Sequence, residues 1–149
     1  MEKKYNQKNM AEKITVSVPV NAPVATVWEC WTNPGHITEW CFASDDWCAP
    51  HATNDVRVGG TFTTRMEAVD KSGGFDFGGT YTEVATEQHM TYVMNGEDAR
   101  EVTVTFAPTE DGGCLVTETF DAETLNPLEM QRAGWQAILE NFKIHVEKH

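Results

Sequence analysis

The sequence lacks several features that would place it at once in a large class of proteins. Among its 149 residues, no apolar run approaches the roughly 20 residues of a membrane-spanning helix. The first 13 residues are polar and lack the apolar middle of a signal peptide. The default expectation is therefore a cytoplasmic protein without a membrane partner.

Basic residues are scarce. The chain has 11 Lys and Arg against 23 Asp and Glu, which gives a net charge of −12. Nucleic-acid binding requires cationic side chains that displace counterions from phosphate, and anionic membranes attract the same groups. We therefore exclude nucleic acids and anionic membrane surfaces as partners.

The chain has four cysteines, at Cys30, Cys41, Cys48 and Cys114. No two of them have the Cys-x-x-Cys spacing. Zinc sites usually show closely paired ligands, and disulfide scaffolds are shorter and richer in cysteine. We expect free thiols that pack as small apolar groups.

A phosphate-binding glycine loop is also missing, because Gly59-Gly60 leads into a strand. The sequence thus predicts no metal site and no cofactor.

What the sequence does contain is a series of short elements. Residues 14–20 alternate apolar and polar side chains, which is typical of a half-buried strand. Pro23 and Pro34 each follow an Asn-containing start signal, so two short helices are predicted, the second reaching about Trp40.

An antiparallel meander is predicted next. The expected strands span residues 61–69, 75–85, 90–94, 101–107 and 114–120. Asn95-Gly96 is a hairpin signal, and Gly78-Gly79 indicates a bulge or sharp bend. Residues 102–106 alternate apolar and polar side chains, so one face of the sheet should be covered and the other solvated.

A long helix should end the chain. Asn126-Pro127 opens it, with Glu129 in the position of a capping box. Its apolar stripe consists of Leu128, Trp135, Ile138, Leu139, Phe142 and Val146. A helix of about 20 residues with such a stripe must lie across the sheet. The predicted fold is α+β: a curved antiparallel sheet of about six to seven strands wraps around this helix. Residues 13–149 should form a single domain after a flexible tail, 1–12.

Several short motifs in this order carry a resemblance to a known family. They are Ala22-Pro23 with Trp28 and Trp31, Asn33-Pro34 with Trp40, Asp55-x-Arg57-x-Gly59-Gly60 with Met66, Gly79-x-Tyr81-x-Glu83-Val84, residues 102–106, and Gly134-Trp135 with Leu139. The chain resembles the START-like or birch-pollen-allergen-like superfamily, SRPBCC, which has the helix-grip fold. More narrowly, it is similar to the activator-of-heat-shock-protein-90-ATPase homologue family. The name-giving co-chaperone has an additional N-terminal domain, which twelve polar residues cannot supply, so chaperone activation is not expected.

The resemblance implies an internal cavity but no common activity, because the superfamily includes lipid carriers, hormone receptors, polyketide cyclases and co-chaperone domains. The leading expectation is binding of a small apolar or amphipathic molecule, lipid-like or polyketide-like. The alternatives are an enzyme of the cyclase, hydrolase or dehydratase type and a chaperone-regulating interaction module. A homodimer is a common assembly for such small domains and is a further expectation.

The residues expected to contact the ligand are mostly aromatic. They are Trp28, Trp40, Phe62, Met66, Tyr81, Tyr92, Met94, Phe106, Glu118, Phe120, Trp135, Leu139 and Phe142. The alternative is that these side chains fill the interior as ordinary core. A catalytic role is left open, with Glu118, Tyr92, Asp45 and His51 as the candidates.

Glu118 is the first of these candidates because it shares strand parity with Val116 and Phe120, which places it on the concave face. Burial there would raise the pKa of its carboxyl and suit it to act as a general acid. Arg65 or Arg100 could instead neutralise it. Tyr92 could orient a ligand through its hydroxyl.

The segment from Ser44 to His51 is the second candidate region and the expected rim of the pocket. Asp45, Asp46 and His51 could serve as acid and base, or as metal ligands. The simpler interpretation is a solvated loop in which Asp residues form turns. We favour that interpretation because adjacent Asp side chains rarely converge.

Overall fold

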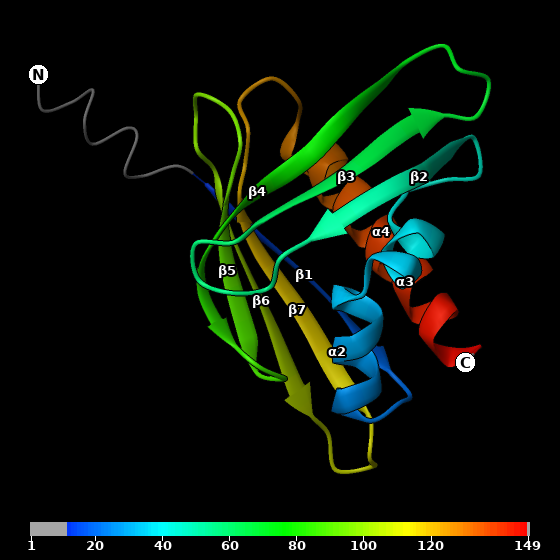
Figure 1. Ribbon diagram of the computed structural model, residues 1–149, viewed down its shortest axis with the longest axis vertical. Coiled ribbons are helices and arrows are strands. Elements are labelled where there is room, and N and C mark those ends of the chain that lie inside the picture. Colours follow the sequence, from blue (N-terminus) through cyan, green and yellow to red (C-terminus); the bar gives the residue numbers. More distant parts are fainter. Residues whose placement is uncertain (1–11, 149) are drawn as a thin grey trace, which may run out of the picture.

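The computed structural model describes residues 12–148, so residues 1–11 of the expected flexible tail lie outside the described part of the chain. The elements run in the order β1 (Lys13–Val20), α2 (Val24–Thr32), α3 (Pro34–Trp40), β2 (Trp47–Asn54), β3 (Thr61–Ala68), β4 (Gly74–Ala85), β5 (His89–Met94), β6 (Glu101–Pro108), β7 (Cys114–Asp121) and α4 (Leu128–Glu147) (Figure 1). No helix in this described part is long and apolar enough to cross a bilayer.

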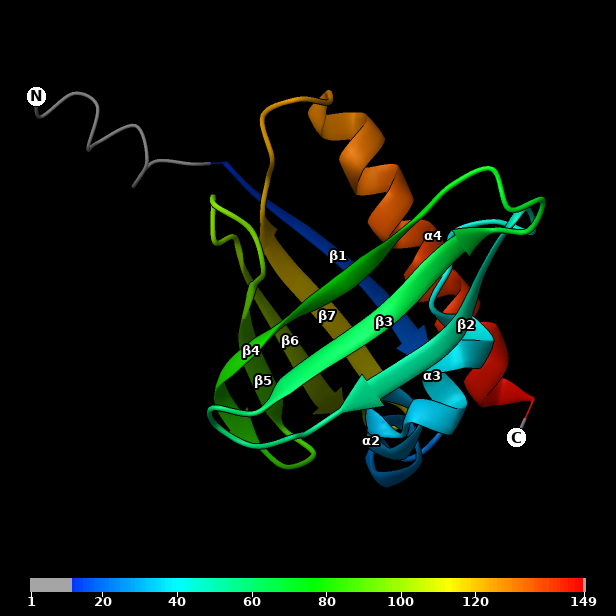
Figure 2. The ribbon, with the colours of Figure 1, turned by 45° about the horizontal axis from the view of Figure 1, so that its top comes forward.

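The strands form one antiparallel sheet of seven strands in the order β1-β7-β6-β5-β4-β3-β2. Consecutive strands from β2 to β7 are neighbours, as in a meander, whereas β1 and β2 lie on opposite edges. Helices α2 and α3 make the connection between these two edges, and the sheet curls strongly between them (Figures 1 and 2). The predicted helix-grip architecture is confirmed.

Helix α4 packs against the concave face through Trp135. The Trp135 ring stacks on Phe120 of β7 with centroids 3.8 Å apart, and it meets Phe77 of β4 edge-on at 6.3 Å. Because β4 and β7 lie on different parts of the curl, one helical side chain joins both walls of the sheet. Further along the same face, Leu139 and Phe142 are fully buried. This apolar burial is the main contribution of α4 to the core.

Strand β2 corrects the expectation that Ser44 to His51 is a loop. Only residues 44–46 precede the strand, and residues 47–54 pair with β3 at the edge of the sheet. The register shifts between Cys48 and His51, which places Pro50 in a bulge. A bulge at an edge tolerates a residue without an N–H donor, so the polar composition and the proline conceal the strand in the sequence.

The predicted capping box of α4 was also wrong. The N-cap position is Pro127, which makes no side-chain cap, and the Asn126 side chain instead donates to Glu123 Oε2 at 2.6 Å. Glu123 additionally accepts hydrogen bonds from the backbone N–H groups of Leu125 and Asn126. The acidic side chain thus organises the loop before α4, a contact between close neighbours that competes with the helix cap.

The two glycines in β4 permit a close approach of neighbouring strands. A Cβ on Gly78 would lie 2.5 Å from the carbonyl oxygen of Phe62, and one on Gly79 would lie 2.5 Å from that of Val93. The register shift itself lies between Tyr81 and Glu83, beyond the glycine pair. The glycines therefore allow curvature, and the bulge follows two residues later.

A Gly78→Ala variant is expected to lower the free energy of unfolding by about 1–3 kcal/mol, because the added methyl group forces the strands apart. Gly73→Ala is the matched control, since a Cβ there meets nothing within 4 Å. Urea unfolding of both variants measures the difference. Equal stability of the two variants would show that the close approach at Gly78 is not required.

Candidate functional site

A cavity of about 260 Å³ lies between the concave face of the sheet and the helices α3 and α4. Small-molecule sites typically enclose roughly 300–1,000 Å³, so this cavity, just below that range, suits a small ligand. Its lining is Trp31, Ile37, Trp40, Cys41, Asn54, Phe62, Thr64, Met66, Phe75, Phe77, Tyr81, Met90, Tyr92, Met94, Arg100, Glu118, Trp135 and Ile138.

The structure brings most of the expected ligand-contacting residues to this cavity. Those that line it are Trp40, Phe62, Met66, Tyr81, Tyr92, Met94, Glu118 and Trp135. Those that do not line it are Trp28, Phe106, Phe120, Leu139 and Phe142. The second group packs in the hydrophobic core or against it, so these side chains stabilise the cavity from behind.

Aromatic rings build one wall of the cavity by packing on one another. Phe62 lies at the centre, with its ring centroid 4.7 Å from that of Tyr92, 5.4 Å from Tyr81 and 5.6 Å from Phe77. These edge-to-face and tilted contacts hold the rings against the sheet. The aromatic side chains therefore line the space and do not fill it.

Several lining residues were missed by the sequence analysis. Phe75 and Phe77 share strand parity with Tyr81, and this signal was obscured by the expected bulge at Gly78-Gly79. Arg100 directly precedes β6 and lies two residues before the buried Val102, so the alternation of the strand turns both side chains to the same face. Cys41 and Asn54 end their elements, where no periodic signal identifies the direction of a side chain.

Glu118 occupies an apolar position in the middle of strand β7. It pairs in register with Val16 of β1 on one side and with Val104 of β6 on the other, and both valines are buried. The side chain is 5% exposed and makes no hydrogen bond or ion pair with any residue from 12 to 148. Burial raises the pKa of this carboxyl to about 8. At neutral pH the group is therefore mainly a neutral carboxylic acid.

Neither of the two candidate arginines neutralises Glu118. Arg65 binds Glu67 at 3.0 Å and Asp76 at 3.4 Å on the sheet surface. Arg100 lies beside Asp98, with 3.2 Å between Nε and Oδ2. The carboxyl is thus left to interact with whatever occupies the cavity.

Two further titratable groups surround Glu118. Burial raises the pKa of the Cys41 thiol to about 12 and that of the Tyr92 phenol well above its ordinary value, and the nearby Glu118 adds to both shifts. The Tyr92 hydroxyl makes no hydrogen bond within the described residues. The cavity therefore presents a hydroxyl and a carboxyl whose hydrogen-bonding capacity is unused.

The other tyrosine at the cavity has a structural partner. The Tyr81 hydroxyl donates to Asn54 Oδ1 at 2.6 Å, and Asn54 Nδ2 donates to the carbonyl oxygen of Thr32 at 2.8 Å. This chain of contacts links β4, β2 and the end of α2. It fixes the wall of the cavity and leaves Tyr81 with no free proton for a ligand.

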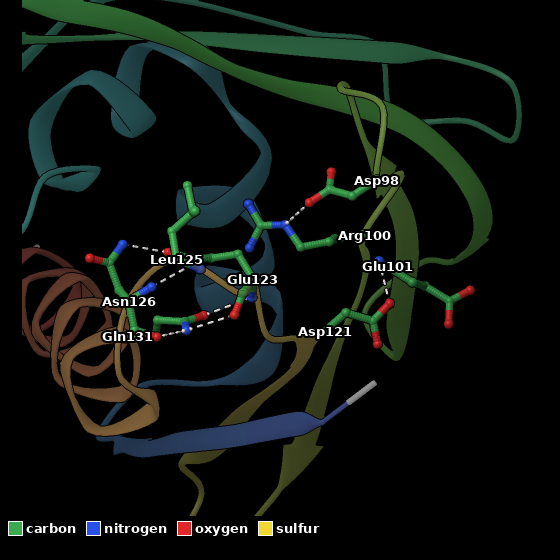
Figure 3. A network of polar contacts seen from close by, with 8 residues as sticks. All are labelled: Asp98, Arg100, Glu101, Asp121, Glu123, Leu125, Asn126 and Gln131. Atoms are coloured by element: carbon green, nitrogen blue, oxygen red, sulfur yellow. Dashed lines mark hydrogen bonds and ion pairs between the residues drawn. The ribbon is translucent and has the colours of Figure 1, made fainter. Parts of the chain in front are cut away.

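Arg100 brings a positive charge to the lining of the cavity. Figure 3 shows its guanidinium beside Asp98. Its Nε is buried near Asp98 and does not meet hydrogen-bond geometry with that carboxylate or with any other described group. The loop before α4 is held by Gln131, whose amide accepts from the backbone N–H of Glu123 at 2.9 Å and donates to the carbonyl oxygens of Glu123 and Asn126. The Arg100 guanidinium lies beside this hydrogen-bonded loop (Figure 3).

The acidic segment before β2 is not part of this cavity. Asp45, Asp46 and His51 are exposed and absent from its lining. Asp46 accepts a hydrogen bond from the Ser44 hydroxyl at 2.5 Å, which is typical of a local turn. The structure therefore does not bring Asp45 or His51 together with Glu118 and Tyr92.

Comparisons with known proteins agree with this architecture. The family described as "Activator of Hsp90 ATPase homolog 1-like protein" matches residues 21–147. No curated protein matches the chain.

Two solved structures are close to the chain in sequence. The AHSA1-like protein from Aeromonas hydrophila is 44% identical, with a TM-score of 0.84, and the match covers 92% of this chain and 93% of that one. The protein Chr148 from Cytophaga hutchinsonii is 46% identical, with a TM-score of 0.77 and coverage of 91% and 92%.

A third structure, the protein CV1439 from Chromobacterium violaceum, shares the fold at 23% identity, with a TM-score of 0.81 and coverage of 91% and 98%. The family match begins just before α2, ends at the last residue of α4 and includes every strand but β1. The chain is a helix-grip protein of the SRPBCC superfamily and belongs to the family of activator of Hsp90 ATPase homologue 1-like proteins.

Proposed function

We propose that this protein binds a small amphipathic molecule in the cavity between the sheet and α4. The observation that carries the proposal is an apolar cavity of about 260 Å³ whose lining includes a buried carboxyl and a buried phenol without protein partners. A buried polar group without a partner costs about 1–3 kcal/mol, and a bound ligand can supply the missing hydrogen bond. The arrangement therefore suits a ligand with an apolar body and one polar group.

The protonation of Glu118 restricts the polar group of the ligand. With a pKa of about 8, the carboxyl carries its proton at neutral pH and donates a hydrogen bond. The favoured partner is an acceptor such as a carbonyl or ether oxygen. The surrounding rings of Phe62, Phe77 and Trp135 suit an aromatic or unsaturated body. A lipid-like or polyketide-like carbonyl compound meets both requirements.

Catalysis is a second candidate, and it rests on the same carboxyl. An acid whose pKa lies near the ambient pH can transfer a proton to a bound carbonyl compound, as a cyclase or dehydratase requires. Tyr92 would then orient the reacting oxygen. Binding does not depend on this step, so a Glu118→Gln variant that retains a ligand but loses turnover would separate catalysis from carriage.

The proposal is tested by native mass spectrometry of the protein purified from its source, which should carry a co-purifying small molecule. That molecule is then titrated into delipidated protein while tryptophan fluorescence is recorded. Trp31, Trp40 and Trp135 line the cavity, so occupation should change their emission.

A matched pair of variants locates the binding site. Thr64 is 3% exposed and lines the cavity, whereas its neighbour Thr63 lies on the opposite face of β3. Thr64→Phe fills the space and should weaken binding at least tenfold, while Thr63→Phe should leave the affinity unchanged. If both variants bind as the wild type does, or if no small molecule is recovered, the proposal is wrong.

A further inference from the structure

Three metal-binding side chains converge outside the cavity, where α2, α3 and α4 meet. Cys30 comes from the last turn of α2, His36 from the first turn of α3 and His145 from the last turn of α4. The Cys30 sulfur and one ring nitrogen of each histidine all lie within 4.8 Å of one another. Cys30 is 2% exposed and His145 is 5% exposed, whereas His36 is half-buried and gives access to solvent.

We propose that Cys30, His36 and His145 form a binding site for a zinc ion. One thiolate and two imidazoles are ligands that Zn²⁺ prefers, and three protein ligands leave a fourth tetrahedral position for water. Hard cations such as Mg²⁺ and Ca²⁺ prefer oxygen ligands, so this donor set selects against them. The proposal does not depend on the cavity or on its ligand.

Zinc binding would change the distances between the three ligand atoms. His36 Nδ1 and His145 Nε2 are 2.9 Å apart. Two imidazole nitrogens on tetrahedral zinc, each about 2.0–2.1 Å from the metal, are separated by about 3.3 Å. The rings would therefore move apart by a few tenths of an ångström, and the sulfur would approach to about 3.6 Å from each nitrogen.

A carboxylate supports the outer nitrogen of His145. Glu39 Oε1 lies 3.7 Å from His145 Nδ1, so the ring presents Nδ1 to the carboxylate and Nε2 to His36. A carboxylate behind a ligating histidine is a common arrangement in zinc proteins, because it fixes the tautomer and strengthens the ligand. Glu39 is the residue in this structure that would have that positioning role.

The protons balance in a simple way. Without metal, one of the two rings donates the N–H of the hydrogen bond between His36 Nδ1 and His145 Nε2. When zinc binds, that proton moves to the other nitrogen of the same ring, and the Cys30 thiol releases its proton to solvent. One proton per zinc therefore leaves the protein, and two nitrogen–metal bonds and one sulfur–metal bond form.

The helices that carry the ligands are held in place independently of any metal. The Trp40 indole donates to the carbonyl oxygen of Cys30 at 2.9 Å, which ties α3 to α2. Asn33 accepts from the backbone N–H of Gly35 at 2.8 Å and caps the start of α3, the turn that contains His36. The first two ligands are therefore preorganised by the short connection between the helices.

Cobalt(II) is the probe for the test, because it replaces zinc in tetrahedral sites and reports thiolate coordination by absorption. Reduced, metal-free protein titrated with Co²⁺ should bind one ion with a thiolate-to-cobalt charge-transfer band, and Zn²⁺ should displace it. Cys30→Ser should abolish this band and lower zinc affinity at least tenfold. Glu39→Gln should lower the affinity by about 10–100-fold with the band retained.

Matched controls distinguish this site from adventitious binding. Cys114 is another free thiol, 1% exposed, on β7, so Cys114→Ser should leave both the band and the affinity unchanged. Circular dichroism first establishes that each variant is folded. If Cys30→Ser does not fold, His36→Gln replaces it, because His36 is only half-buried. That variant should lower zinc affinity at least tenfold. The proposal is overturned if the wild type binds no Co²⁺ at micromolar concentration, or if it shows no thiolate band. Unchanged affinity in the variant used, Cys30→Ser or His36→Gln, also overturns it.

Discussion

A Glu118→Gln variant is expected to be more stable than the wild type at neutral pH, by up to about 3 kcal/mol at pH 7. The wild-type carboxyl is buried between valines without a partner, and its ionised form is therefore costly in the folded state. The amide has nearly the same shape and does not ionise. The cost of taking up a proton when the chain folds is thus removed without leaving a cavity.

The pH dependence of this stability difference identifies the ionisation of Glu118 as its cause. The pKa of Glu118 is about 8 in the folded protein and near 4.5 in the unfolded chain. Between these values the folded state retains a proton that the unfolded state releases, so wild-type stability falls as the pH rises from about 4.5 to 8. The advantage of the variant should therefore grow from below about 1 kcal/mol at pH 5 to about 3 kcal/mol at pH 7.

Urea unfolding at several pH values between 5 and 8 measures this change. Glu110→Gln is the control, because it removes the same charge from an exposed position. The control should follow the pH profile of the wild type, whereas Glu118→Gln should diverge from both. Parallel profiles for all three proteins would mean that Glu118 is ionised at neutral pH in the folded state, and the proposed hydrogen-bond donor in the cavity would be lost with it.

Phe142→Ala should lower the free energy of unfolding by about 3–5 kcal/mol, the usual cost of removing a buried phenylalanine ring. Phe142 is fully buried, and its ring centroid lies 4.9 Å from that of Trp31 and 4.8 Å from that of Trp40. Both tryptophans line the cavity, so the loss of the ring removes the support behind one wall.

Chemical denaturation compares this variant with Ile144→Ala on the same helix. Ile144 is 56% exposed, so its truncation should change stability by no more than about 0.5 kcal/mol. A similar small effect at Phe142 would show that α4 is not anchored to α2 and α3 through this ring. The fluorescence of Phe142→Ala should also shift toward longer wavelength, because water gains access to Trp31 and Trp40.

Local patterns in the sequence determined most of the secondary structure. Alternation located β1, β6 and β7 to within a residue at each end, and the two prolines placed the starts of α2 and α3. Strand parity alone placed Glu118 on the concave face, where the structure has it. These features depend on neighbours in the chain, which is why they could be predicted from one sequence.

Other features depended on contacts between distant segments. Strand β2 is defined by its pairing with β3 and has no periodic pattern of its own. The division of the aromatic residues into cavity lining and plain core follows from how Phe62 packs against its neighbours. Asp45 proved to lie in the turn before β2 and His51 on the exposed side of that strand, so both face solvent.

The cavity and the Cys30, His36 and His145 cluster show the same limit most clearly. His36 and His145 are 109 positions apart, and no spacing rule connects them. Periodicity reports which face a side chain occupies, and the sequence by itself therefore determined the sheet, the long helix and the inward direction of Glu118. Only the packing of α2, α3 and α4 decided which inward side chains meet, because the distance between side chains on different elements depends on the whole tertiary structure.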